Sequence, residues 1–370
     1  MDFEIRPFRP VDEEYLACLA VQACYPEDPQ DTLDEWKYHD QTARKDVLRA
    51  RFVLTLGSVI IGYGVVSDSY WLDMEDRIQF DHTVHPDYEG WVVDRKPIHD
   101  HVERYVLSLI SDRQIKVLLT TAREDNMVNV GWLTDNGYRA VRRSPSSSLD
   151  VAAFDFGKWE GCVEKVEASG IEFLSRTYLQ EHDPAWHTKL YEAWVEIKLD
   201  APTSNEERPI SVNEFNKMLN SSAMCPETNL IAVDNGSQVA SCSGFGAYAG
   251  LTLANPLLRN ATDGGIRFTG VRRAWRRKGI ATAIKLKSIA HGHDLGCARM
   301  RTSNEENNPM YGINIKLLPG RSTENSSNEE RESVGREAAE MNSMQLSNPS
   351  AISKPTAVSH SIPTCCQGGI

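Results

Sequence analysis

A short basic segment that contains a glycine carries the clearest chemical signal in this sequence. Arg276, Gly279 and Ala281 follow the spacing Arg-x-x-Gly-x-Ala, between a predicted strand over 264–271 and a helix predicted to begin near Gly279. The first N–H groups of a helix lack partners within it and carry partial positive charge, so a bound anion is stabilised there. Small residues let a ligand approach the backbone closely. The segment is therefore predicted to bind a phosphate-bearing ligand.

The elements that would position this segment follow it in a defined order. A helix is predicted over 279–291, a strand over 297–302 and a second helix, led by Asn308, over 307–317. This succession of strand, basic turn, helix, strand and Asn-led helix resembles the cofactor-binding half of the GNAT-type N-acetyltransferases. The resemblance implies an α/β fold with a mixed (α+β) sheet. It also implies acetyl-CoA as the co-substrate, with its pyrophosphate held at the turn.

The resemblance further implies which residues contact acetyl-CoA. Backbone groups of Thr269 and Val271 would meet the pantetheine arm. Asn308 matches a family Asn that touches the same arm, although an Asn here is equally expected as a plain helix N-cap. The residues that would surround the pyrophosphate are Arg276, Arg277, Lys278, Gly279, Ile280 and Ala281.

The groups that would move protons remain open. In the GNAT reaction an amine attacks the thioester directly, so a base must take a proton from the ammonium and an acid must stabilise the leaving thiolate. The candidate bases are Glu305 and Glu306, with a water chain as the alternative and solvated acids as the plain reading. Many family members have a Tyr as the acid where this chain has Asn314. Tyr311, one turn earlier, is the candidate acid or else a core residue.

The same order of predicted elements occurs twice along the chain. A first unit is predicted over 1–156, a helical connector over 157–169 and a second unit over 170–318. The duplication resembles the tandem GNAT proteins, in the arrangement of mycothiol synthase. The tail over 319–370 holds many Ser, Asn and Glu without periodic apolar residues, which predicts disorder. The second unit would then lack its last two strands, so two tandem GNAT domains with a disordered tail are expected.

The first unit is predicted to be degenerate at the phosphate turn. The residues that align without gaps to Arg276, Gly279 and Ala281 are Glu89, Val92 and Asp94. Carboxylates would repel a pyrophosphate, and a β-branched side chain would keep it from the backbone. The first unit is therefore expected to bind acyl-CoA poorly or not at all, and to shape the substrate cleft or stabilise its neighbour. His82 and His85 in this unit are expected to lie at the surface.

Composition argues against several classes of function. The 370 residues are 41% hydrophobic and 25% charged, as in globular proteins. The formal net charge of −12 disfavours a general nucleic-acid binder, because phosphate binding requires clustered positive charge. There is no apolar run of about 18 residues and no signal-peptide core, so a cytoplasmic location without membrane contact is expected. The eight cysteines lack metal-ligand spacing, so reduced thiols and no metal are expected.

These observations predict an N-acetyltransferase that transfers an acetyl group from acetyl-CoA to the primary amine of a small molecule, or less favourably of a peptide. The chemistry is expected in the second unit. The alternative is a non-catalytic acyl-CoA-binding or scaffold protein of the same fold, which the missing Tyr and the shortened second unit favour. Nucleic-acid binding through 272–278 is disfavoured by the overall acidity. The sequence indicates neither the acceptor nor the oligomeric state.

Overall fold

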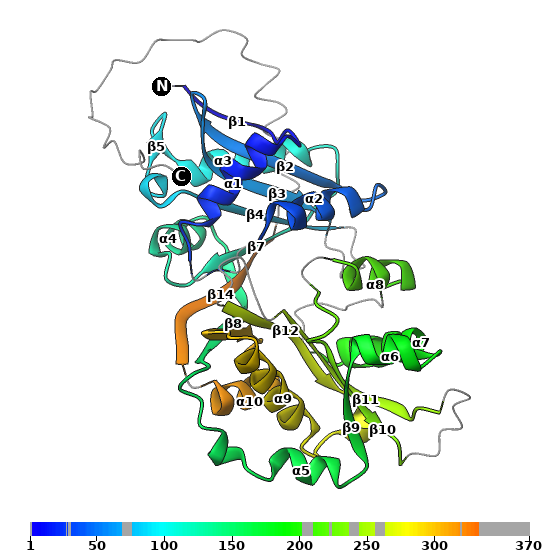
Figure 1. Cartoon of the computed structure of the whole chain (residues 1–370). Coiled ribbons are helices and arrows are strands. Elements are labelled where there is room, and N and C mark those ends of the chain that lie inside the picture. The colour runs from blue at the N-terminus through cyan, green and yellow to red at the C-terminus, as the bar shows by residue number, and fades with distance from the viewer. Residues whose placement is uncertain are drawn as a thin grey trace.

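A 12-stranded sheet runs through the whole molecule (Figure 1). The computed structural model describes residues 2–26, 28, 31–68, 76–201, 210–221, 224–236, 244–255, 263–318 and 320–332. The strands of the first half of the sequence are β1 (Phe3–Pro7), β2 (Arg49–Leu56), β3 (Val59–Ser67), β4 (Arg77–Val84), β7 (Val117–Arg123) and β8 (Arg139–Asp150). Those of the second half are β9 (Ile171–Ser175), β10 (Leu230–Asp234), β11 (Ala247–Asn255), β12 (Asp263–Val271), β13 (Arg299–Ser303) and β14 (Gly320–Glu332).

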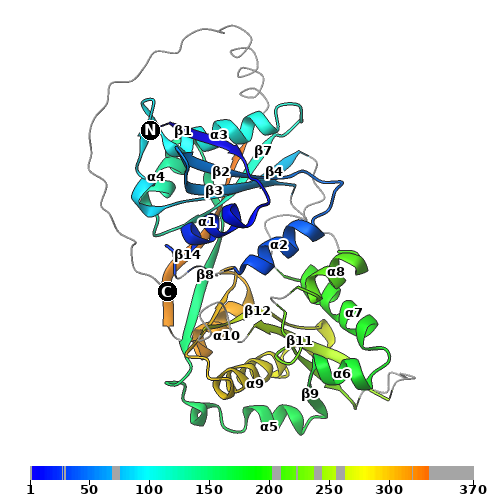
Figure 2. The ribbon, with the colours of Figure 1, turned by 45° about the horizontal axis from the view of Figure 1, so that its top comes forward.

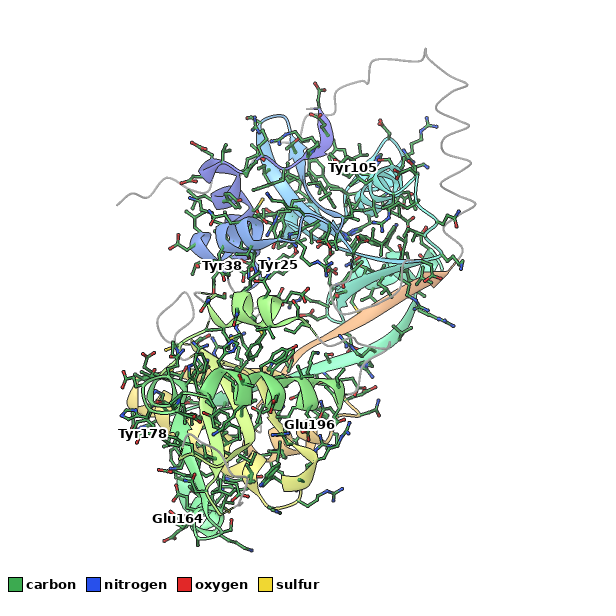
Figure 3. The ribbon with its side chains drawn as sticks, turned by 90° about the vertical axis from the view of Figure 1, so that its right-hand side faces the viewer. Tyr25, Tyr38, Tyr105, Glu164, Tyr178 and Glu196 are labelled. Atoms are coloured by element: carbon green, nitrogen blue, oxygen red, sulfur yellow. The ribbon has the colours of Figure 1, made fainter. Side chains whose placement is uncertain are left out.

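The two halves of the sheet exchange their last strands. The order is β1-β2-β3-β4-β7-β14-β8-β13-β12-β11-β10-β9. The six strands counted inward from β1 therefore correspond, in order, to the six counted inward from β9. β8 comes from the first half of the sequence but pairs with β13, while β14 comes from the second half and pairs with β7. Figures 2 and 3 show these two long strands crossing between the halves. Each half therefore depends on the other for its sixth strand.

The prediction that the tail is disordered is wrong for residues 320–332, which form β14. β14 pairs with β7 from Ser326 to Glu332 and with β8 on its other edge. Its sequence, GRSTENSSNEERE, has no aliphatic or aromatic residue, so apolar periodicity gives no signal. Backbone hydrogen bonds on both edges place it instead. Residues 333–370 lie outside the described residues.

Helices cover both faces of each half. The helices of the first half are α1 (Asp12–Gln22), α2 (Leu33–Thr42), α3 (Ile98–Leu109) and α4 (Met127–Asp135). Those of the second half are α5 (Cys162–Glu167), α6 (Arg176–His182), α7 (Trp186–Leu199), α8 (Val212–Leu219), α9 (Ile280–Asp294) and α10 (Pro309–Leu317). Two of them begin with capping boxes, in which Thr32 pairs with Glu35 and Ser211 with Glu214. Such reciprocal bonds satisfy the first N–H groups of a helix.

Successive side chains of a single strand pack in different hydrophobic clusters, one on each face of the sheet. In β10, Ile231 packs with the α7 and α8 residues, whereas the next residue, Ala232, packs with Ile280 and Ile284 of α9. Successive side chains of a strand point to opposite faces. α7 and α8 therefore cover one face of the second half and α9 covers the other. The first half repeats this, because Val53 of β2 packs with α1 and α2 while its neighbours pack with α3 and α4.

One buried charge in α9 gives a testable stability effect. Lys285 is only 1% exposed, and burial lowers its pKa to about 7 from 10.5. Between these two pH values the unfolded chain binds a proton that the folded chain lacks, so stability rises with pH. Lys285→Met removes this titration. We expect the variant to be more stable than wild type by up to about 5 kcal/mol at pH 6.5, with the gain disappearing toward pH 10.5.

Urea unfolding at several pH values measures this effect. Lys287→Met is the matched control, because Lys287 is 35% exposed on the same helix and pairs with Glu167 at 2.9 Å. An exposed pair of this kind contributes little and is screened by solvent, so the control should shift stability about equally at all these pH values. Equal pH dependence in the two variants would contradict the assignment of a lowered pKa to Lys285.

Candidate functional site

β12 and β13 run side by side for only a short distance. Their parallel pairing is Asp263↔Arg299, Gly264↔Met300 and Gly265↔Arg301. Beyond Gly265, β12 continues to Val271 and pairs with β11 alone. Over 266–271, one edge of β12 therefore has no partner strand among the described residues. In the first half, β4 and β7 diverge in the same way after three pairs.

The backbone of the last β12 residues points toward this open edge. The N–H of Arg272, the residue after β12, donates to the carbonyl of Ala249 in β11 at 2.9 Å. Backbone groups of successive strand residues alternate in direction, so those of Val271 and Thr269 face away from β11. The Nε of Arg276 donates to the Val271 carbonyl at 2.9 Å. The open edge thus offers main-chain groups, one of which a side chain already occupies.

The turn after β12 exposes the start of α9. A short 3-10 helix, η3 (Arg273–Trp275), leads into Arg277 and Gly279, whose φ values of 64° and 84° are both left-handed. Gly279 is the N-cap of α9, and no side chain of the described residues caps this end. Gly279 is exposed, whereas Ile280 is buried in the core. The first amides of α9 therefore lie at an open surface, where an anion can reach them.

Two acids balance part of the positive charge at this turn: Glu196 lies in α7, and Asp200 directly follows its last residue. Glu196 pairs with Arg272 at 2.6 Å, and Asp200 accepts hydrogen bonds from Arg273 and Arg276. The bonds from Arg273 and Arg276 lower the pKa of Asp200 to about 2. Partial burial alone would raise the pKa of Glu196, but its bonds from arginine lower it. These arginines are held in place by the acids and so fix the shape of the turn.

The remaining cations of the turn are available to a ligand. Arg277 and Lys278 are exposed and form no ion pair with the residues that the structure describes. They flank the left-handed Gly279 and the start of α9. The arrangement has an exposed helix N-terminus, two unpaired cations and a neighbouring open strand edge. It can bind an extended ligand that has a phosphate group at one end.

The other predicted site residues cluster at the start of α10. Asn308 caps this helix, because its Oδ1 accepts from the Met310 N–H at 2.9 Å. The Glu305 carboxylate accepts two bonds from Asn307, at 2.7 and 2.9 Å. Glu306 and Tyr311 both lie near the guanidinium of Arg143 in β8. The structure thus brings Glu306 and Tyr311 into one neighbourhood and engages Glu305 and Asn308 in local bonds.

Asn314 stands where the family resemblance places a Tyr, and it belongs to the core. It is 0% exposed, and its Nδ2 donates to Asn304 Oδ1 at 2.6 Å. Its Oδ1 is buried without a hydrogen-bond partner among the described residues. A buried amide that is tied to Asn304 does not serve as an acid at the surface of the sheet.

The gapless alignment of the two turns is wrong. Tyr88, which aligns with Trp275, is followed by a hairpin of β5 (Val92–Val93) and β6 (Lys96–Pro97) before α3 begins at Ile98. Asp94 and Arg95 at its tip have φ values of 49° and 64°. Positive φ at both central residues is typical of a two-residue hairpin turn. The start of α3 therefore aligns with the start of α9, and an inserted hairpin replaces the short basic turn.

Glu89 anchors a polar network in the first half. The Tyr25 hydroxyl donates to the Val84 carbonyl at 2.6 Å, and Val84 aligns with Val271. Glu89 Oε1 lies 3.0 Å from that hydroxyl and accepts from Asn126 Nδ2 at 3.0 Å. Side chains of this half therefore occupy the edge that is open in the second half. This supports the expectation that the first half binds acyl-CoA poorly.

The expectation that His82 lies at the surface is wrong. Its Nε2 is 2.8 Å from Nδ1 of His99, whose Nε2 is in turn 3.0 Å from Glu89 Oε2. Burial lowers the pKa of His82 to about 3, so its ring is neutral near pH 7. The chain of contacts extends the Glu89 network inward. His85 is partly exposed, and its Nδ1 accepts from the Asp87 N–H at 3.2 Å.

A cavity of about 360 Å³ lies between the two halves. Its lining includes Tyr38, Arg44 and Arg49 from the first half and Lys217, Met218 and Arg267 from the second. Figure 3 shows Tyr38 on the side of the first half that faces the second. Sequence reasoning missed this site. Its one sequence signal is Arg267, a lone charge within the Gly-Ile-Arg-Phe-Thr-Gly run of β12.

Metal-binding clusters and membrane-spanning helices are both absent from the described part of the chain. No group of three or more His, Cys, Asp and Glu residues there is arranged to hold a metal ion. None of the helices there is long and apolar enough to cross a membrane.

No protein-family model matches the sequence, and no curated protein matches it significantly. The solved structures that are similar to this chain include three that are GNAT or GCN5-related proteins. A GCN5-related N-acetyltransferase from Sphaerobacter thermophilus is 18% identical with a TM-score of 0.58, covering 89% of this chain and 95% of its own. A tandem GNAT protein from the clavulanic acid biosynthesis pathway is 15% identical with a TM-score of 0.61, covering 90% and 98%.

The third is a GCN5-related glucosamine N-acetyltransferase region of a fungal multi-domain β-N-acetylglucosaminidase. It is 12% identical with a TM-score of 0.59, covering 89% of this chain and 38% of its own. Structural similarity at sequence identities this low establishes a shared fold only. The chain has the GNAT N-acetyltransferase fold, built as two units that share one sheet.

Proposed function

We propose that this chain is an N-acetyltransferase that transfers the acetyl group of acetyl-CoA to the primary amine of a small molecule. Its second half binds the cofactor. The observation that carries this proposal is the exposed, uncapped start of α9 directly beside the open edge of β12. In the first half, Tyr25 and Glu89 occupy the corresponding strand edge.

Acetyl-CoA is held at two places in this proposal. The pyrophosphate binds at Gly279, Ile280 and Ala281 through their amides, and Arg277 and Lys278 add positive charge. The pantetheine arm runs along β12 and meets the backbone of Thr269 and Val271. Arg276 lies at the junction, and it releases the Val271 carbonyl when the arm binds. Asn308 orders the start of α10 beside the arm.

The reaction is direct attack of the amine on the thioester carbonyl. Holding the two reactants together can lower the barrier by roughly 7–11 kcal/mol, so positioning supplies much of the rate. We assign the base to Glu306 in preference to Glu305, whose carboxylate is engaged by Asn307. Tyr311 is the candidate acid for the leaving thiolate. Arg143 of β8 lies near both Glu306 and Tyr311, so the two candidates share one neighbourhood.

A second candidate function is acyl-CoA binding without catalysis. The observation in its favour is Asn314, which is buried and bonded to Asn304 where an acidic Tyr would stand. If Tyr311 also fails to reach the thiolate, the chain would bind the cofactor without turning it over.

One experiment separates the two candidates. Calorimetry measures acetyl-CoA binding to the full chain, and a thiol assay then measures CoA release with a panel of primary amines. We expect binding, and acetylation of at least one amine well above the rate of thioester hydrolysis. Binding without turnover of any amine would favour the non-catalytic function. Absence of binding would overturn both.

A further inference from the structure

We infer that the cavity between the halves receives the acceptor amine, and that this acceptor carries an anionic group, a carboxylate or a phosphate. The inference deepens the proposed function and rests on it for the identity of the reaction. At about 360 Å³ the cavity falls within the range of roughly 300–1,000 Å³ that small-molecule sites occupy.

Contacts between the halves fix the walls of the cavity. The hydroxyl of Tyr38 in α2 donates to the carbonyl of Lys217 in α8 at 2.7 Å. The Nζ of Lys217 donates back to the Thr42 carbonyl of α2 at 2.9 Å. Arg44 of the first half pairs with Glu214 of α8 at 3.2 Å. These bonds join α2 to α8, so both halves are needed to form the site.

Part of the positive charge in the lining is balanced by acids. Arg44 pairs with Asp46 as well as Glu214, and Arg49 lies 3.4 Å from Asp40. Among the described residues that line the cavity, Glu214 is the only acid. These two arginines therefore contribute little net charge to a ligand.

Lys217 and Arg267 carry the unbalanced charge. The ammonium of Lys217 contacts a carbonyl rather than a carboxylate. Arg267 is exposed and has neither an ion pair nor a hydrogen bond with any residue that the structure describes. Two cations that face one cavity and have no carboxylate partner among the described residues favour an anion there, and arginine matches carboxylate and phosphate geometry.

A bulge in β12 places Arg267 in this cavity. Phe268 pairs with Leu253 of β11, and Ile266 pairs with the next β11 residue, Ala254, so Arg267 is the extra residue. Ile266 packs on the α9 side of the sheet, and Phe268 packs with the α7 and α8 cluster. A bulge redirects a side chain in this way. Arg267 therefore joins the α8 side, where the cavity lies.

The bulge also lies close to the proposed reaction centre. Arg267 is two residues beyond Gly265, where β12 leaves β13, and two residues before Thr269. An anion bound by Arg267 would hold its amine next to the strand that carries the pantetheine arm. The cavity thus selects acceptors in which amine and anion lie a few bonds apart.

A matched panel of amines tests this class of acceptor. We compare O-phosphoethanolamine, β-alanine and ethanolamine as acceptors for the full chain, measuring CoA release. The phosphate and carboxylate arms identify the anion, and ethanolamine has neither. We expect at least one anionic amine to have a kcat/KM about 10-fold or more above that of ethanolamine, since a bond to a charged group is worth about that factor. A preference for ethanolamine would overturn the inference.

Variants then locate the selectivity. Arg267→Gln and Lys217→Gln should each raise KM for the preferred anionic amine about 10-fold, raise KM for ethanolamine much less and leave acetyl-CoA affinity unchanged. Arg267→Lys should restore part of the selectivity, which a merely structural role would not predict. An equal effect on all three amines would contradict the assignment.

Failure of the enzyme function remains distinguishable from failure of this inference. Titration of the two anionic amines and of inorganic phosphate into the full chain, without acetyl-CoA, measures the cavity directly. Binding that Arg267→Gln weakens about 10-fold supports an anion site even where no amine is acetylated. Absence of binding both with and without acetyl-CoA would overturn the inference.

Discussion

A chain that ends at Leu318 should lose the stable fold of both halves. Such a chain lacks β14, which pairs with seven consecutive residues of β7 from Arg123 to Val117 and with β8 on the other edge. Each lost backbone bond costs about 0.5–1.5 kcal/mol, whereas a domain is stable by only about 5–15 kcal/mol. Loss of both ladders therefore exceeds the stability of the sheet. Urea unfolding and size-exclusion chromatography measure the effect.

The matched control is a chain that ends at Glu332, which keeps every strand pairing of β14. We expect it to unfold at the same urea concentration as the full chain. The exchanged strand would be refuted as a structural element if the chain ending at Leu318 unfolded cooperatively at that concentration too.

Gly279→Val should abolish measurable acetyl-CoA binding, with an affinity loss of about 100-fold or more. At φ 84° a β-branched residue is strained, and its Cβ would lie 3.3 Å from Val166 Cγ2. The added side chain would stand at the first amides of α9, where the pyrophosphate is proposed to bind. Such strain costs about 1–3 kcal/mol, so the melting temperature should fall as well.

The stability effect requires a control that is strained alike but lies far from the ligand. Gly296, just after the other end of α9, has φ 77° with open space around it. Gly296→Val should lower the melting temperature comparably and leave acetyl-CoA affinity unchanged by calorimetry. Similar affinities in the two variants would place the cofactor elsewhere.

Elements with local signals were predictable from the sequence. The helix expected over 279–291 is α9, and the one expected over 307–317 is α10. Both begin at residues whose chemistry suits a helix start, Gly279 and Asn308. The mixed α/β fold with two GNAT-like units is confirmed. The division at 156 and 170 and the cofactor contacts stay predictions.

Features that depend on distant partners were not predictable. β14 has no apolar residue, and only its neighbours β7 and β8 make it a strand. Arg267 reaches the cavity because of a register shift against β11, which no local pattern encodes. Glu196 and Asp200, the acids that bind the arginines of the basic turn, lie in α7 and at its end, more than 70 residues earlier in the chain. Each of these features requires the strand register or the packing of the whole chain.

The exchange of strands has a consequence for synthesis. Arg123 pairs with Ser326, 203 residues later (326 − 123), so the first half cannot complete its sheet while the ribosome is still translating the second. Domains usually fold in the order in which they emerge, and contacts of long sequence separation form slowly. Until β14 has been synthesised, the edge of β7 that pairs with it in the folded chain therefore stays unpaired. Chaperone binding to stalled nascent chains should therefore persist until residues 320–332 have left the exit tunnel.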